Sequence, residues 1–124
     1  MTSADDALAV RDLVVRYGPK TAVADLSFRA RAGRVTALVG PNGAGKTSTV
    51  ESCVGLRRRA GGAVELLGTD VPASGVIDPR VRGRVGVMLQ DGGLYPTARP
   101  LELVRHVAGL YPQADDPAEL LDQL

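Results

Sequence analysis

The sequence predicts an α/β fold, in which strands and helices alternate along the chain. The stretch Leu26–Arg31 alternates apolar and polar side chains, as a strand with one buried face does. The run Arg34–Gly40 is almost continuously apolar, which is typical of a strand buried on both faces. A glycine-rich turn and a helical pattern follow that run. A strand, a tight turn and a helix in this order are the building unit of α/β domains.

The composition fits one modest globular domain. The 124 residues are 44% hydrophobic and 23% charged, and the net charge of +1 gives no strong attraction to nucleic acid or anionic lipid. The single cysteine, Cys53, cannot form an internal disulfide, which fits a reducing cytoplasm, and we expect it to pack against the sheet. No stretch approaches the roughly 20 apolar residues of a membrane-spanning helix. Any role at a membrane would therefore go through a partner.

The first two strands flank a Gly-Pro turn. The segment Ala7–Gly18 mixes apolar and charged residues and is predicted as a strand ending at Gly18-Pro19. The segment Thr21–Arg31 is the second strand, and Leu26, Phe28 and Ala30 share its buried face. The apolar run Arg34–Gly40 is expected to be the third strand.

A helix is predicted after the glycine turn. Val50, Cys53 and Val54 recur at helical spacing and form one face of a helix that fades at Gly55. The three arginines 57–59 follow the helix end, where we expect them to offset its dipole in solvent. Residues 61–70 then form a strand between glycine turns.

The second half of the chain predicts one more strand and two helices. The apolar strand Val85–Leu89 stops at Gln90. Beyond Pro96 a helix follows, with an apolar face made of Leu101, Val104, Val107 and Ala108. Asp116 is the expected N-cap of a last helix, with Pro117 at its first position. The chain stops at Leu124 without a capping glycine or polar tail, so we expect the intact protein to continue.

The ten residues from Gly40 to Thr49 read GPNGAGKTST and contain a phosphate-binding pattern. Gly40, Gly45, Lys46 and Thr47 match G-x-x-x-x-G-K-[ST], the P-loop. Backbone N–H groups must converge on phosphate oxygens, so Gly43 and Gly45 keep side chains away and permit a positive φ. The start of the following helix adds unpaired N–H donors. The sequence therefore predicts a nucleoside triphosphate site.

The pattern assigns roles within the loop. Lys46 is expected to reach the β- and γ-phosphates as a catalytic residue, and the Thr47 hydroxyl to ligate Mg²⁺. The alternative is a glycine turn that only joins a strand to a helix. The residues expected to bind the nucleotide are Gly40, Pro41, Asn42, Gly43, Ala44, Gly45, Lys46, Thr47 and Ser48.

Two further residues flank the loop at a distance. Tyr17 lies 23 residues before Gly40, and Gln90 lies 44 residues after Lys46. Taken alone, Tyr17 is equally an ordinary aromatic residue at a strand end, and Gln90 a surface glutamine that closes a strand. Their joint spacing around the loop is what favours a functional role.

With these features the chain resembles the ATP-binding subunit of ABC transporters from about Leu8 to Leu121. The matching stretches are LVVRYGPKTAVADLSF, GPNGAGKTST, GAVELLGTDV and VGVMLQDGGLYP. The stretch that starts LQDGGLYP is most similar to exporters of drugs and small molecules. The resemblance implies that Tyr17 stacks on adenine and that Gln90 contacts Mg²⁺ and the attacking water. The implied cofactors are ATP and Mg²⁺.

The resemblance also implies the architecture, a P-loop NTPase core with an antiparallel β-subdomain. Residues 1–95 would form the nucleotide-binding core, and residues 96–124 would begin the helical subdomain. The family's signature motif, its Walker B strand ending in Asp-Glu and its switch histidine do not occur in the 124 residues, and His106 is not given the last role. We therefore expect an amino-terminal half that holds ATP. Because the family's Asp-Glu pair supplies the general base and its signature motif closes over ATP, the 124 residues alone are expected to lack turnover.

The implied function is that of a transporter ATPase subunit, most similar to exporters. It would couple ATP binding and hydrolysis to transport through a separate membrane subunit. The expected partners are a second ATP-binding subunit and an integral membrane permease, with no nucleic acid, and the expected location is cytoplasmic, on the inner face of the membrane. Two alternatives stay open: a non-transport ABC ATPase of translation or DNA repair, and a nucleotide-binding module without catalysis.

Overall fold

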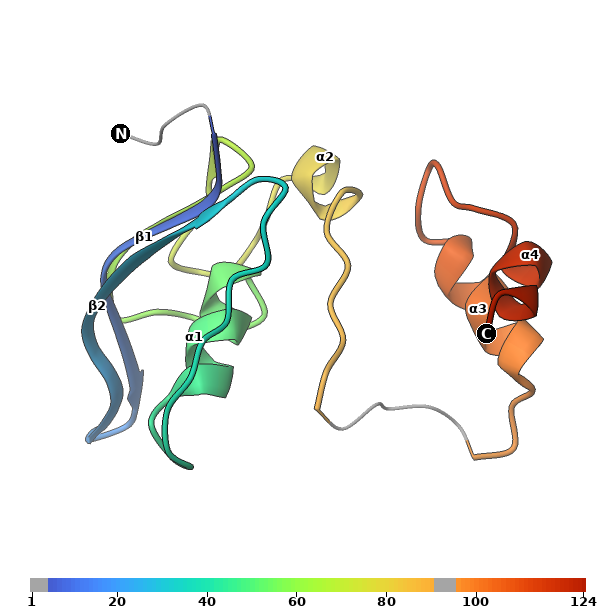
Figure 1. Ribbon diagram of the computed structural model, residues 1–124. Helices are drawn as coiled ribbons and strands as arrows, with labels where there is room; N and C mark the ends of the chain where they lie inside the picture. The colour runs from blue at the N-terminus through green and yellow to red at the C-terminus, as the bar shows by residue number, and fades with distance from the viewer. Residues whose placement is uncertain (1–4, 91–95) are drawn as a thin grey trace. The chain divides into compact units, whose positions relative to one another are not determined.

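The computed structural model of the chain describes residues 5–90 and 96–124, which divide into two compact units. The first unit runs to Val81 and the second begins at Arg82. Figure 1 draws both along the chain. The expected boundary after residue 95 lies at the edge of the segment 91–95, outside the described residues, and it stays a prediction.

The first unit contains a four-stranded antiparallel sheet with the strand order β2-β1-β3-β4. Its two long strands lie side by side in Figure 1, with Val10 opposite Phe28 and Tyr17 opposite Lys20. The two predicted strands before residue 32 and the strand within residues 61–70 are confirmed. The strands are β1 (Asp6–Tyr17), β2 (Lys20–Arg31), β3 (Gly61–Leu66) and β4 (Thr69–Asp70).

The core of this unit joins the sheet to helix α1 (Lys46–Cys53), which contacts β1, β2 and β3. Removing apolar side chains from water is the main driving force for this packing. The largest fully buried apolar side chains come from β1, β3 and the segment after β4: Val10, Leu13, Val15, Val64 and Val71.

Two apolar segments that were predicted as buried strands are not strands. Neither 34–40 nor 85–89 forms part of the sheet, and Val35 and Met88 are almost fully exposed. Both predictions were wrong at the level of secondary structure. A strand in a sheet interior needs neighbours that accept and donate its backbone hydrogen bonds, and the described residues supply none for either segment.

The predicted buried face of α1 is only partly correct. Cys53 is buried, and burial raises the pKa of its thiol to about 11, in keeping with the expected packing role. Val50, by contrast, is 48% exposed, while Ser48, Thr49 and Ser52 are buried. These small side chains let the helix approach the sheet closely. The apolar spacing therefore misplaced the buried face.

The second unit contains two helices that pack against each other, α3 (Pro100–Ala108) and α4 (Pro117–Asp122). Both helices were predicted. The Asp116 carboxylate accepts a hydrogen bond from the Ala118 N–H at 2.7 Å, which confirms the predicted N-cap. Val104, Val107 and other apolar residues line an open groove of about 500 Å³ between the helices.

A short helix, α2 (Pro79–Arg82), lies where the two units meet in sequence. In the described parts of the chain, no helix combines the length and the apolar character that crossing a bilayer requires.

Candidate functional site

The glycine turn leads from residue 40 directly into α1, and two of its glycines are conformationally required. Gly43 has φ of 82° and Gly45 has φ of 89°, in the left-handed region that disfavours side chains. A Cβ atom on Gly45 would lie 2.5 Å from the carbonyl oxygen of Ala22 in β2. Glycine at position 45 therefore lets the start of α1 lie directly against β2.

Lys46 folds back over the turn that precedes it. Its Nζ donates hydrogen bonds to the carbonyl oxygens of Gly40 at 2.7 Å and Pro41 at 2.8 Å. An ammonium group has three N–H donors, so one donor remains for a ligand. The Ala44 N–H closes the turn by donating to the Pro41 carbonyl at 3.2 Å. The positive charge of the Lys46 ammonium group is thus held against the backbone of the loop.

The start of α1 adds backbone donors to this charge. The Thr49 N–H donates to the Gly45 carbonyl at 2.8 Å, so the N–H groups of Lys46, Thr47 and Ser48 lie at the open end of the helix. The N-cap has no side-chain hydrogen bond, and the first turn has no acidic residue to neutralise the positive end of the helix dipole. Together these groups fit an anion with several oxygen atoms.

The two hydroxyls that follow Lys46 differ in availability. Ser48 is buried, and its Oγ lies 2.7 Å from the Tyr17 hydroxyl. Thr47 is exposed, so its hydroxyl is the one open to a ligand. No cluster of three metal-binding His, Cys, Asp or Glu side chains occurs within the described ranges.

Tyr17 brings the end of β1 to the same helix. Its hydroxyl meets Ser48, and the guanidinium of Arg57 lies over its ring, 4.7 Å from the centroid. The Nε of Arg57 donates to the Glu51 carboxylate at 2.6 Å, and this hydrogen bond raises the pKa of Arg57 above its ordinary value. Tyr17 as a whole nevertheless remains 43% exposed.

Arg57 is the residue of this site that the sequence did not reveal. It was expected to offset the helix dipole in solvent, yet its side chain is 33% exposed and paired with Glu51. The two residues are six positions apart and Arg57 lies beyond the helix end, so no helical spacing rule pairs them. Only the path of the chain after α1 brings them together.

The structure brings Tyr17 to the loop residues 40–48, whereas Gln90 belongs to the second unit. The role of Gln90 beside the loop therefore stays a prediction.

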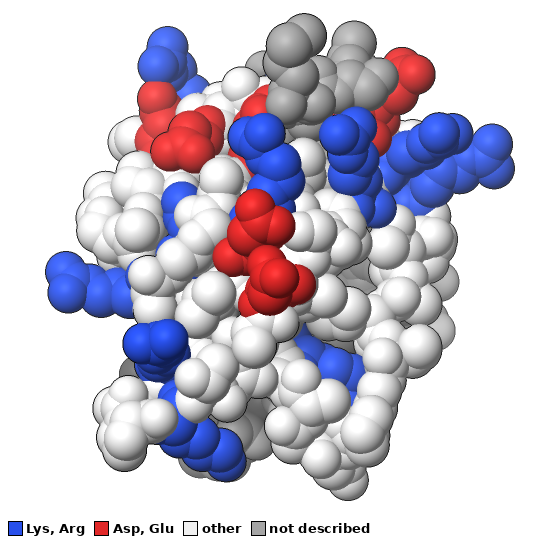
Figure 2. Space-filling view, turned by 90° about the vertical axis from the view of Figure 1, so that its left-hand side faces the viewer, with Lys and Arg blue, Asp and Glu red and all other residues white. Residues whose placement is uncertain are grey.

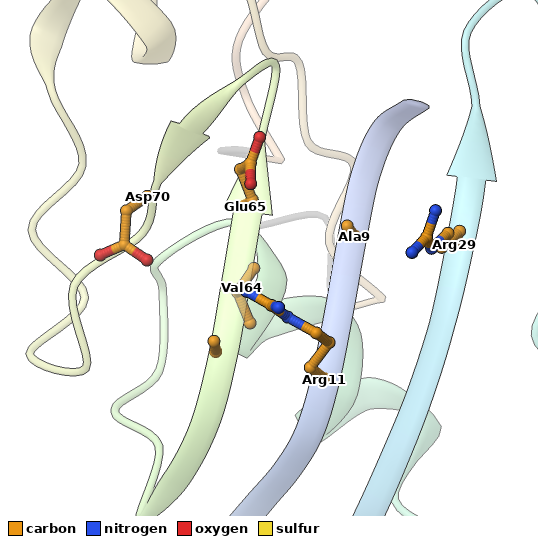
Figure 3. A pocket seen from close by; sticks show the side chains of 7 residues that line it. Ala9, Arg11, Arg29, Val64, Glu65 and Asp70 are labelled. Atoms are coloured by element: carbon orange, nitrogen blue, oxygen red, sulfur yellow. The ribbon is translucent and has the colours of Figure 1, made fainter. Parts of the chain in front are cut away.

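A hollow on the sheet is too small to compete with the loop as a ligand site. It has a volume of about 30 Å³, room for about one or two water molecules, and Figure 3 shows that it crosses all four strands. Its charged lining is mixed, since it includes Arg11 and Arg29 as well as Glu65 and Asp70. Figure 2 likewise shows basic side chains scattered over one face of the molecule with acidic ones among them.

Comparison with known proteins finds one family throughout. The ABC transporter family model matches residues 23–124. The Nod factor export ATP-binding protein I of Ralstonia nicotianae is 42% identical over 89 residues, which is 72% of this chain and 27% of that protein. The phosphate import ATP-binding protein PstB of Rubrobacter xylanophilus is 36% identical over 118 residues, which is 89% of this chain and 41% of that protein.

A solved structure described as the ATP binding subunit of an ABC transporter shares the fold. It superposes with a TM-score of 0.74 at 27% identity, over 95% of this chain and 47% of its own length. The predicted P-loop α/β fold is thereby confirmed. The chain spans between about a quarter and a half of the length of these three proteins.

Proposed function

The chain belongs to the ABC transporter family, and on that premise we propose that it is the ATP-binding part of a transporter ATPase. One observation carries this proposal: the Nζ of Lys46 stands over the glycine turn beside the unpaired N–H groups of α1. A cation and several N–H donors around one concave turn match the charge and shape of a phosphate chain.

Different residues would bind different parts of the nucleotide. The loop N–H groups and the remaining donor of Lys46 would hold the β- and γ-phosphates. The exposed hydroxyl of Thr47 would ligate Mg²⁺, which neutralises phosphate charge when it is bound. The exposed part of the Tyr17 ring would stack on the base. The hydroxyl of Ser48 is committed to Tyr17, so Ser48 would contribute its backbone N–H.

Hydrolysis and transport extend the proposal to the whole protein. Gln90 would approach Mg²⁺ and the attacking water, and a second ATP-binding subunit would complete the site. ATP binding and hydrolysis would be coupled to transport through a separate integral membrane permease. These partners would place the protein at the inner face of the membrane. The names of the relatives include export and import. We propose export because the Nod factor export protein of Ralstonia nicotianae is 42% identical to this chain, against 36% for the phosphate import protein.

Replacing Lys46 tests the nucleotide site. In Lys46→Ala the binding of Mg²⁺-ATP is expected to weaken by about 1.5–3 kcal/mol, roughly 10- to 150-fold, because a charge-assisted phosphate contact is lost. Calorimetric titration of the purified protein measures this change. Lys20, the only other lysine, is exposed at the start of β2 and provides the matched control Lys20→Ala. An ATP affinity that Lys46→Ala leaves at the level of the control would refute the proposal.

A further inference from the structure

We infer that Arg57, clamped by Glu51, is a positioning residue that fixes the Tyr17 ring so that its open face receives the base of a bound nucleotide. This inference rests on the proposed nucleotide site and concerns how that site recognises a base. It assigns a role to two residues outside the P-loop.

The clamp on Arg57 acts through both its side chain and its backbone. The Glu51 carboxylate accepts from Arg57 Nε at 2.6 Å, and the Glu51 carbonyl accepts from the Arg57 N–H at 3.2 Å. The side chains are 33% and 22% exposed, so neither partner is fully solvated. Glu51 lies within α1, which ties the position of the guanidinium to the helix that starts at the loop.

The Tyr17 ring is held at its tip and over one face. Its hydroxyl is 2.7 Å from Ser48 Oγ, and the Arg57 guanidinium lies 4.7 Å from its centroid. A guanidinium at this distance is attracted to the π face of the ring. Tyr17 is 43% exposed while its hydroxyl is engaged and one face lies under the guanidinium, so we infer that the opposite face of the ring is open. A planar base can stack there, on a ring whose orientation is already set.

The neighbouring arginines do not share this arrangement. Arg58 is exposed, and Arg59 donates from Nε to the carbonyl of Gly62 at 3.1 Å. Arg57 is therefore the member of the three-arginine run that contacts the ring. Arg58 makes a matched control, since it carries the same charge one position further along the chain.

The test compares two ligands, Mg²⁺-ATP and inorganic tripolyphosphate, by calorimetric titration. Arg57→Ala is expected to weaken ATP binding about 2- to 5-fold, the size of an exposed cation–π contact, and to leave tripolyphosphate binding unchanged. Arg58→Ala is expected to alter the two affinities by the same factor. In a Tyr17→Ala background, Arg57→Ala is expected to have no further effect on ATP, because the ring that it positions is gone.

Three outcomes would overturn the inference. An equal loss for both ligands would mean that Arg57 acts only through its charge. Tighter ATP binding by Arg57→Ala would mean that the guanidinium occupies the face that the base needs. ATP binding that depends on Lys46 but not on Arg57 would remove this inference and leave the proposed function standing, whereas no dependence on Lys46 would remove the proposed function itself.

A conservative variant covers the case in which Arg57→Ala does not fold. Arg57→Lys keeps the charge but loses the planar guanidinium and the Nε donor to Glu51. We expect it to weaken ATP binding selectively, with tripolyphosphate binding unchanged. ATP binding equal to that of the parent chain would show that the guanidinium is not needed.

Discussion

Tyr17 combines a contact that stabilises the fold with a surface that is available for binding. In Tyr17→Phe the hydroxyl of Ser48, a residue that is only 7% exposed, loses its hydrogen-bond partner. We expect the free energy of unfolding to fall by about 1–2 kcal/mol, the cost of leaving a buried polar group unsatisfied. ATP binding by the folded protein should change little, because the ring face remains. Urea unfolding and ATP titration of the same variant measure the two effects.

Ser48→Ala provides the control for this prediction. Removing both hydroxyls leaves no unpaired group, so the double variant should lose less stability than the sum of the single variants. Strict additivity would show that the two hydroxyls do not interact in the folded protein.

Tyr17→Ala is expected to weaken ATP binding by about 1–3 kcal/mol, because the surface on which the base would stack is lost.

At the same scale, the sequence predicted one part of the candidate site better than the other. The conformations of Gly43 and Gly45 follow from a motif in which every member is close in sequence, so local reasoning sufficed. The contact of Arg57 with Tyr17 joins residues forty positions apart. It depends on the turn after α1, and no spacing rule predicts where such a turn sends a side chain.

At the scale of elements, the start of α1 is held against β2 through Gly45. Gly45→Ala adds a side chain at φ of 89° and places its Cβ 2.5 Å from a backbone oxygen that cannot easily move. Gly43→Ala adds a side chain at a similar φ of 82°, but no other atom lies within 4 Å of the added Cβ. We expect Gly43→Ala to cost about 1–2 kcal/mol of unfolding free energy and Gly45→Ala at least about 1 kcal/mol more.

Urea unfolding of both glycine variants measures this difference. The pair isolates packing from backbone strain, since the strain is common to both. Equal losses of stability would contradict the close approach of α1 to β2.

Elements were predictable where their partners are near in sequence. The hairpin of β1 and β2 pairs strands joined by the Gly18-Pro19 turn, and the alternation of β2 from Leu26 onward identified its less exposed face. The segments 34–40 and 85–89 have the apolar character of interior strands but no pairing partner among the described residues. The apolar character of a segment indicates that its side chains favour burial, whereas a strand also requires a neighbouring backbone for its hydrogen bonds. The sequence of the segment alone does not show whether such a neighbour is present.

At the scale of the molecule, the first unit contains Lys46, Thr47 and Tyr17, and the second contains Gln90. The family model matches residues from both units, and the solved ATP-binding subunit shares the fold over 95% of the chain. The residues proposed to bind phosphate thus lie within one unit, whereas the proposed hydrolysis and transport involve the whole protein. Both require that a nucleotide binds over Lys46.

Amine labelling followed by mass spectrometry tests that claim without any substitution, because the chain has only two lysines. At an ATP concentration of about ten times Kd, Mg²⁺-ATP should slow the labelling of Lys46 about 10-fold, the factor by which the free site is depleted. Lys20 should react at the same rate throughout, and adenosine, which has no phosphates, should protect neither lysine. Equal labelling rates of Lys46 with and without ATP, at concentrations that saturate binding, would contradict a nucleotide site at this loop.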